Sequence, residues 1–78
     1  MVERTISLGN YVTINDVRRV VAAAKEISDD EQLIVSMEAH EADKAANIFS
    51  VLEKHDFECT TKGTNNGHEI FIIAKKKH

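Results

Sequence analysis

The sequence predicts an α+β fold, a two-layer α/β sandwich in which two helices cover one face of a four-stranded mixed sheet. Two observations lead to this prediction. Four segments alternate apolar and polar residues or are apolar throughout, as strands do, and two segments repeat apolar residues every three or four positions, as amphipathic helices do. Their order along the chain is β-α-β-α-β-β. Because each helix has one apolar stripe, the pair can cover only one sheet face, and we expect the other face to stay open.

The first half of the chain carries the signals of a strand, a helix and a second strand. Residues 4–8 alternate polar and apolar side chains, and a Gly-Asn step ends this strand. Thr13 and Asp16 stand at the spacing of a capping box, which predicts the start of a helix. An acidic turn at residues 28–31 precedes the second strand at residues 32–38. The apolar positions of the helix fall on one face: Val17, Val20, Val21, Ala24 and Ile27.

The second half carries a second helix and a hairpin. The helix is expected to open over residues 39–43, where acidic side chains suit the helix dipole. Residues 57–62 and 68–75 are the last two strands, and the loop between them, residues 63–67, contains the Asn-Gly step typical of hairpins. The expected buried stripe of the second helix comprises Ala45, Ile48, Phe49 and Leu52.

The connections predict how the strands pair. Strand–helix–strand units are right-handed crossovers that join parallel strands, whereas a short loop joins antiparallel strands. We therefore expect the early strands to be parallel and the last two to form a hairpin. Alternation along the strands places Ile34, Phe71 and Ile73 on the open face, whereas a shift of one residue in register would place them on the helix side. An apolar group at that place would suit a protein partner or a homodimer.

Length and composition limit the classes of protein to consider. The 78 residues form a single domain, residues 1–78, with 42% apolar and 29% charged residues. No apolar run reaches the roughly 18 residues that span a membrane, and the N-terminus lacks the apolar core of a signal peptide. We therefore expect no membrane partner. A single cysteine allows no internal disulfide, so we also expect a cytoplasmic protein. The net charge of −3 argues against a dedicated nucleic-acid binder.

The reactive side chains are interpreted as structural. Cys59, the only thiol, falls in the middle of a strand on the same face as Phe57 and Thr61, where a cysteine behaves as a small hydrophobic residue. The four histidines lack the spacing of a zinc site. The acids of residues 28–31 and of the second helix start, Glu41 among them, are expected to be exposed. With no phosphate loop, nucleophile elbow or acid–base cluster, the sequence predicts no enzyme, no catalytic residue, no metal and no cofactor.

Basic residues gather at two places in the chain. Lys75, Lys76 and Lys77 lie near the C-terminal end, and Arg18 and Arg19 lie on the first helix. Nucleic-acid binding requires several such contacts in one patch, and no aromatic residues interleave with these. The lysines are therefore interpreted as a solubilising end. Nucleic-acid binding through them is kept as an alternative function.

The layout resembles the TusA/SirA-like family of small sulfur carriers over nearly the full length of the chain. A short strand ends in Leu8-Gly9, a first helix follows, and an acidic turn leads into Leu33-Ile34-Val35. A second helix comes next, and residues 57–74 close as a hairpin that ends in lysine. The resemblance implies a βαβαββ two-layer sandwich. The same topology is also similar to the Alba-like nucleic-acid-binding proteins.

In the TusA/SirA-like family, a Cys-Pro-x-Pro motif stands at the junction of the first strand and helix, and its thiol holds a persulfide. Residues 11–15 here read Tyr-Val-Thr-Ile-Asn, so the thiol and both prolines are absent and no functional residue carries over. We therefore expect a non-catalytic TusA-like domain that binds another protein within sulfur-relay or redox machinery. The contact is expected at Tyr11, Thr13 and Asn15 or on the open sheet face. The alternative is a sulfur carrier whose thiol is displaced to Cys59.

Overall fold

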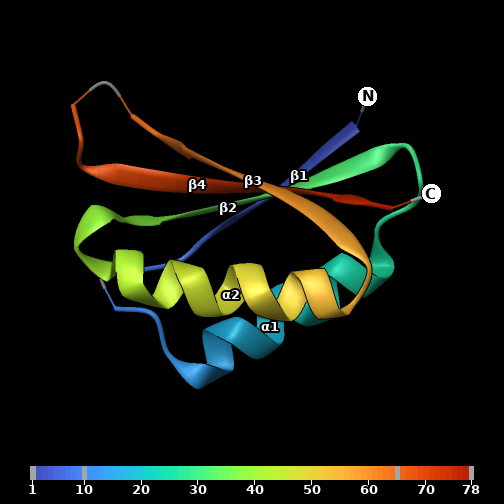
Figure 1. Cartoon of the computed structure of the whole chain (residues 1–78), viewed down its shortest axis with the longest axis horizontal. Coiled ribbons are helices and arrows are strands. Elements are labelled where there is room, and N and C mark those ends of the chain that lie inside the picture. Colours follow the sequence, from blue (N-terminus) through green and yellow to red (C-terminus); the bar gives the residue numbers. More distant parts are fainter. Residues whose placement is uncertain (1, 10, 65, 78) are drawn as a thin grey trace.

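The computed structural model describes residues 2–9, 11–64 and 66–77 (Figure 1). It confirms the predicted α+β architecture, a four-stranded mixed sheet with two helices packed on one face. Figure 1 shows the two layers edge-on, with the sheet above and both helices below it. Three residues of predicted features lie outside the described residues: Asn10 of the first turn, Asn65 of the hairpin loop and His78.

The elements follow the predicted order and differ from the prediction at their ends. The first strand begins at Val2, before the predicted start at residue 4. The second helix opens as a 3-10 turn, because the backbone N–H of Ala42 donates to the carbonyl of Ala39. Among the described residues, no helix is long and apolar enough to cross a membrane. The elements are β1 (Val2–Ser7), α1 (Ile14–Glu26), β2 (Glu31–Glu38), η1 (Ala39–Glu41), α2 (Ala42–Lys54), β3 (Phe57–Gly63) and β4 (Glu69–Lys76).

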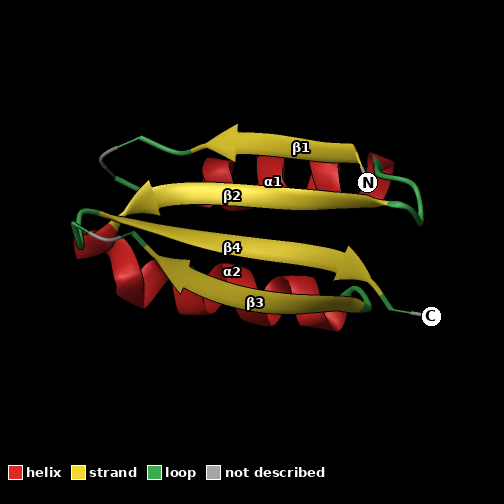
Figure 2. Cartoon of the chain, turned by 90° about the horizontal axis from the view of Figure 1, so that it is seen from above, coloured by secondary structure: helices red, strands yellow, loops and turns green. Residues whose placement is uncertain are grey.

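The strands lie in the order β1-β2-β4-β3, as Figure 2 shows from above the sheet. β1 and β2 are parallel and β3 and β4 are antiparallel, as the connections predicted, and β4 is also antiparallel to β2, a pairing that the connections did not predict. Residues 70–74 of β4 are apolar on both faces of the sheet, which suits an interior strand with neighbours on either side. β3 is an edge strand, and its residues from Thr60 onward are exposed.

The core lies between the sheet and the helices. Alternation along β2 directs Leu33, Val35 and Met37 to the helix side, and each is at most 2% exposed. Ile72 and Ala74 of β4 lie in register with Val35 and Leu33 and are fully buried. Burial of each large apolar side chain stabilises the fold by about 1.5–3 kcal/mol. The helices complete the core with Val20, Ala24, Ile48 and Leu52.

Candidate functional site

The three residues predicted to contact a partner lie at the junction between β1 and α1. Tyr11 is 74% exposed, and its ring meets the ring of His40 edge-on, with 6.1 Å between the ring centroids. Thr13 is the N-cap of α1, and Asn15 lies exposed in the first turn of that helix. The junction therefore presents an exposed aromatic ring and an exposed side-chain amide.

The backbone N–H and the hydroxyl group of Thr13 are engaged in capping α1. Its backbone N–H donates to Asp16 Oδ2 at 2.9 Å, and its hydroxyl oxygen accepts from the backbone N–H of Asp16 at 3.2 Å. The hydrogen bond from the Thr13 backbone holds the pKa of Asp16 below its usual value of 3.8, and Arg19, at 3.1 Å from the carboxylate, acts in the same direction. Thr13 therefore stabilises the start of α1, and Tyr11 and Asn15 are the predicted site residues left for contact with a partner.

The expectation that Glu41 is exposed is wrong, because this residue is only 4% exposed. Its Oε1 accepts a hydrogen bond from the backbone N–H of Val12 at 3.1 Å, and its Oε2 pairs with Lys44 Nζ at 3.2 Å. A carboxylate can be buried when such contacts replace its lost hydration. Glu41 therefore ties the β1–α1 loop to the start of α2, and it contributes to the fold of the junction.

Cys59 is half-buried on β3 and lies on the core side of the sheet with Phe57. Burial raises the pKa of the Cys59 thiol to about 11, and the carboxylate of Glu53 adds to the increase while Lys77 opposes it. At pH 7 roughly one such thiol in 10,000 is ionised. Because the thiolate is the form that attacks disulfides and electrophiles, Cys59 lacks the activation of a carrier thiol.

This raised pKa predicts slow alkylation of Cys59 in the folded protein. At pH 8 we expect iodoacetamide to react about 100-fold more slowly than with free cysteine, because the thiolate fraction is smaller by about that factor. The rate should keep rising up to about pH 11. Intact-mass spectrometry against time measures it, and urea-unfolded protein is the control that should react at the ordinary rate. A rate that levels off below pH 8 in the folded protein would contradict the assignment.

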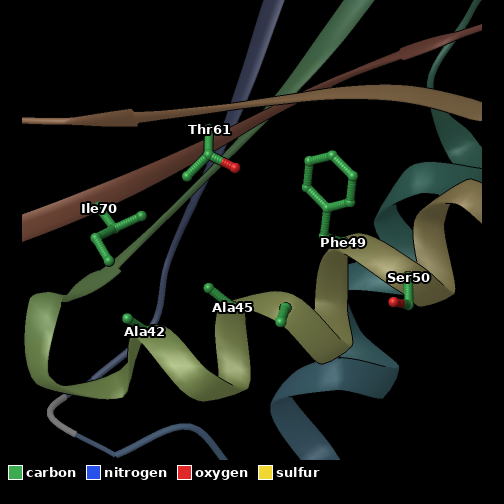
Figure 3. Close-up of a pocket in the computed structure, with 7 residues that line it drawn as sticks. Ala42, Ala45, Phe49, Ser50, Thr61 and Ile70 are labelled. Carbon is green, nitrogen blue, oxygen red and sulfur yellow. The ribbon is translucent and has the colours of Figure 1, made fainter.

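An open cleft of about 390 Å³ lies between α2 and the last two strands (Figure 3). Alanines of α2 form its floor, and Phe49, Ile70 and Thr61 stand around it. Phe49 belongs to the predicted buried stripe, and the structure leaves it half-buried at this cleft. None of the lining residues is titratable, so the cleft offers no group for acid–base catalysis. No pattern in the sequence predicts the cleft, because it depends on how α2 packs against β3.

The two groups of basic residues lie in different layers of the molecule. Arg18 and Arg19 lie in the second turn of α1, in the helix layer, and Arg19 is paired with Asp16. Lys75 and Lys76 end β4, which runs opposite to β1 and β2 (Figures 1 and 2). The two groups therefore do not combine into the single patch that phosphate binding requires.

The sheet face opposite the helices carries an apolar group in its middle, as the sequence predicted. Ile34 of β2 lies in register with Ile73 of β4, and Phe71 lies on the same face two residues before Ile73. All three are half-buried, whereas Ile72, which points to the other face, is fully buried. Figure 2 looks onto this open face, with both helices behind the sheet. We refer to Ile34, Phe71 and Ile73 as the apolar centre.

Polar and charged residues surround the apolar centre. Thr5 and Thr60 extend the row of Ile34 and Ile73 to the two sheet edges. Glu3 accepts a hydrogen bond from Gln32 at 2.6 Å within this rim. In strand order, the two neighbouring rows are Glu3, Gln32, Lys75 and Glu58 on one side, and Ser7, Ser36, Phe71 and Lys62 on the other.

No family model, curated protein or solved structure matches the chain. Within residues 2–9, 11–64 and 66–77, no three histidine, cysteine, aspartate or glutamate side chains gather into a metal site.

The geometry singles out three surfaces for contact with a ligand or partner: the junction at Tyr11 and Asn15, the apolar cleft, and the open sheet face. Of these, only the open sheet face combines an apolar middle with a charged surround.

Proposed function

We propose that this chain is a non-catalytic protein-interaction module with a TusA/SirA-like layout, which binds its partner through the open sheet face. The observation that carries the proposal is the apolar centre, Ile34, Phe71 and Ile73, inside a rim of polar and charged residues. Protein–protein interfaces have this plan, with an apolar middle and a polar surround. By its layout, the module would serve cytoplasmic sulfur-relay or redox machinery.

The shape of the face favours a protein as the ligand. A small molecule is usually held in a concave site that covers most of its surface, and a sheet face is too flat to do so. A folded partner can cover the three apolar side chains together. Each half-buried side chain that becomes fully buried contributes roughly 1 kcal/mol or more to the free energy of binding. The high pKa of Cys59 makes a displaced sulfur-carrier thiol the weaker alternative. Nucleic-acid binding is also the weaker alternative, because the two groups of basic residues do not form one patch.

Site-specific photo-crosslinking in living cells tests the proposal. The photoreactive residue p-benzoylphenylalanine replaces Phe71 on the open face, and in a matched variant it replaces Tyr11, the exposed aromatic residue of the β1–α1 junction. We expect discrete protein adducts from position 71 and none from position 11. Adding Ile34→Glu to the position-71 variant should abolish the adducts, because a carboxylate would then stand in the apolar centre.

The outcomes separate the candidate surfaces. Adducts from position 11 alone would move the contact to the junction and overturn the proposal for the sheet face. An absence of adducts from position 71 would also overturn it. Adducts from position 71 that persist with Ile34→Glu would show contact without dependence on the apolar centre, which contradicts the argument from burial.

A further inference from the structure

We propose that the partner of the open sheet face is a second copy of this chain, packed face to face with its strands antiparallel to those of the first. This inference rests on the proposed function and names the partner for the same surface. A two-fold axis that crosses the strands at the row of Ile34 and Ile73 relates the two copies. Such an axis requires one surface to be complementary to itself, and the register of the strands shows this complementarity.

The charges on β3 are arranged so that two antiparallel copies attract each other. The open-face residues in the middle of this strand are Glu58, Thr60 and Lys62. An axis through the row of Thr60 places Glu58 of one copy opposite Lys62 of the other, and symmetry makes this contact twice. Both side chains are exposed, and neither forms an ion pair within the described part of the chain. Both are therefore available to a partner.

The neighbouring strands place apolar side chains at the same axis. The open-face residues of β4 around it are Phe71, Ile73 and Lys75. The axis brings the Ile73 side chains of the two copies together and places Lys75 of one copy over Phe71 of the other, where a cation and an aromatic ring attract each other. On β2, Ile34 meets Ile34 of the second copy. Both apolar centres are thereby covered by one contact.

The other face-to-face arrangement brings like charges together. An axis parallel to the strands would lay β1 over β3 of the second copy and β2 over β4. The register puts Glu3 in the row of Glu58, and Glu38 in the row of Glu69. This axis would therefore oppose Glu3 to Glu58 and Glu38 to Glu69, each twice, and opposed like charges are destabilising. The charge pattern selects the antiparallel arrangement.

The size of the face predicts a weak dimer. Strands lie about 4.8 Å apart and rise about 3.3 Å per residue, so four strands over about seven residues offer about 450 Å² on each copy. Two such faces, packed about 10 Å apart, bury about 900 Å² in total, which is the size class of transient complexes. We therefore expect dissociation at micromolar concentrations and a substantial dimer fraction at about 500 µM.

Charge reversal at β3, measured by sedimentation equilibrium from about 1 µM to about 500 µM, tests the arrangement. In the antiparallel dimer, Lys62→Glu opposes two carboxylates at each of two contacts, and Glu58→Lys opposes two ammonium groups. We expect each single variant to weaken the dimer about tenfold or more. The double variant Glu58→Lys, Lys62→Glu exchanges the charges and should return to within about threefold of the natural chain. A mixture of the two single variants should associate more tightly than either alone.

The control is Lys25→Glu, which reverses an exposed charge on α1 in the helix layer and should leave the dimer unchanged. Circular dichroism checks that each variant is folded. A chain that stays monomeric over the whole range would overturn the inference. So would a double variant as weak as the single variants, because only self-contact of Glu58 with Lys62 allows the exchange of charges to restore binding.

The crosslinking experiment separates this inference from the proposed function. Adducts from position 71 at twice the mass of the chain support both. Adducts of another mass, together with a monomeric chain in sedimentation, leave the proposed function in place and overturn the dimer. An absence of any adduct at position 71 overturns the proposed function itself.

Discussion

The Ile72→Ala variant is expected to lose about 2–5 kcal/mol of unfolding free energy. Ile72 is fully buried in the middle of β4, with the core on its helix side, so truncation removes apolar contacts and leaves a cavity. A domain of this size has a total stability of about 4–12 kcal/mol, so the loss is a large fraction of the whole. Urea unfolding followed by circular dichroism measures the change. Leu52→Ala, which removes a fully buried side chain of α2, should fall in the same range.

The adjacent residue provides a matched control. Ile73→Ala removes the same atoms from the same strand, but Ile73 points to the open face and is only half-buried. At low protein concentration this variant should lose about 1 kcal/mol or less. Equal losses at both positions would contradict the assignment of faces, because a one-residue change in register exchanges the two sides of a strand.

The Glu41→Ala variant is expected to lose about 1–3 kcal/mol of unfolding free energy, which is the cost of a buried donor left without an acceptor. Its carboxylate is the acceptor for the backbone N–H of Val12 at 3.1 Å, and the residue is 4% exposed. Truncation also removes the partner of Lys44. Urea unfolding measures the loss. Hydrogen exchange of the Val12 amide should become faster, because that N–H loses its bond.

Glu41→Gln distinguishes the hydrogen bond from the ion pair. Glutamine keeps an oxygen that can accept from Val12 but cannot pair with Lys44. The Glu41 side chain is 6% exposed and that of Lys44 is 42% exposed, so the ammonium group that loses its partner stays hydrated and the change costs about 1 kcal/mol or less. We therefore expect Glu41→Gln to lie within about 1 kcal/mol of the natural chain. A loss as large as that of Glu41→Ala would show that the charge, and not the acceptor, is the important feature.

The elements could be predicted because their signals are local. The capping box of Thr13 and Asp16 is present with both hydrogen bonds, and the helix begins at the next residue after Thr13. The predicted faces of β4 are confirmed, with Ile72 in the core and Phe71 and Ile73 on the open face, although the residues of this strand are apolar on both sides. These patterns depend only on residues a few positions apart, which the periods of helices and strands bring to one side.

The environment of Glu41 could not be predicted in this way. An acid at a helix start is normally solvated, and the sequence around Glu41 follows that rule. Its burial depends on Val12, which lies in another loop and reaches Glu41 only when α1 and α2 pack side by side. Glu41 is the last residue of the 3-10 turn before α2, and this turn helps to position its carboxylate at the β1–α1 loop that contains Val12. Likewise, the cleft beside Phe49 exists only where α2 crosses β3.

The order of elements, the capped start of α1 and most of the core residues follow from the sequence, because local periodicity and capping encode them. The position of β4 between β2 and β3 is known only from the folded structure. That order brings Glu3 into the row of Glu58, and Ile34 beside Ile73. The charge pattern of the open face, from which the dimer is inferred, is therefore a property of strand pairing. The pairing of β2 with β4 joins segments that are distant in the chain, and no local pattern specifies it.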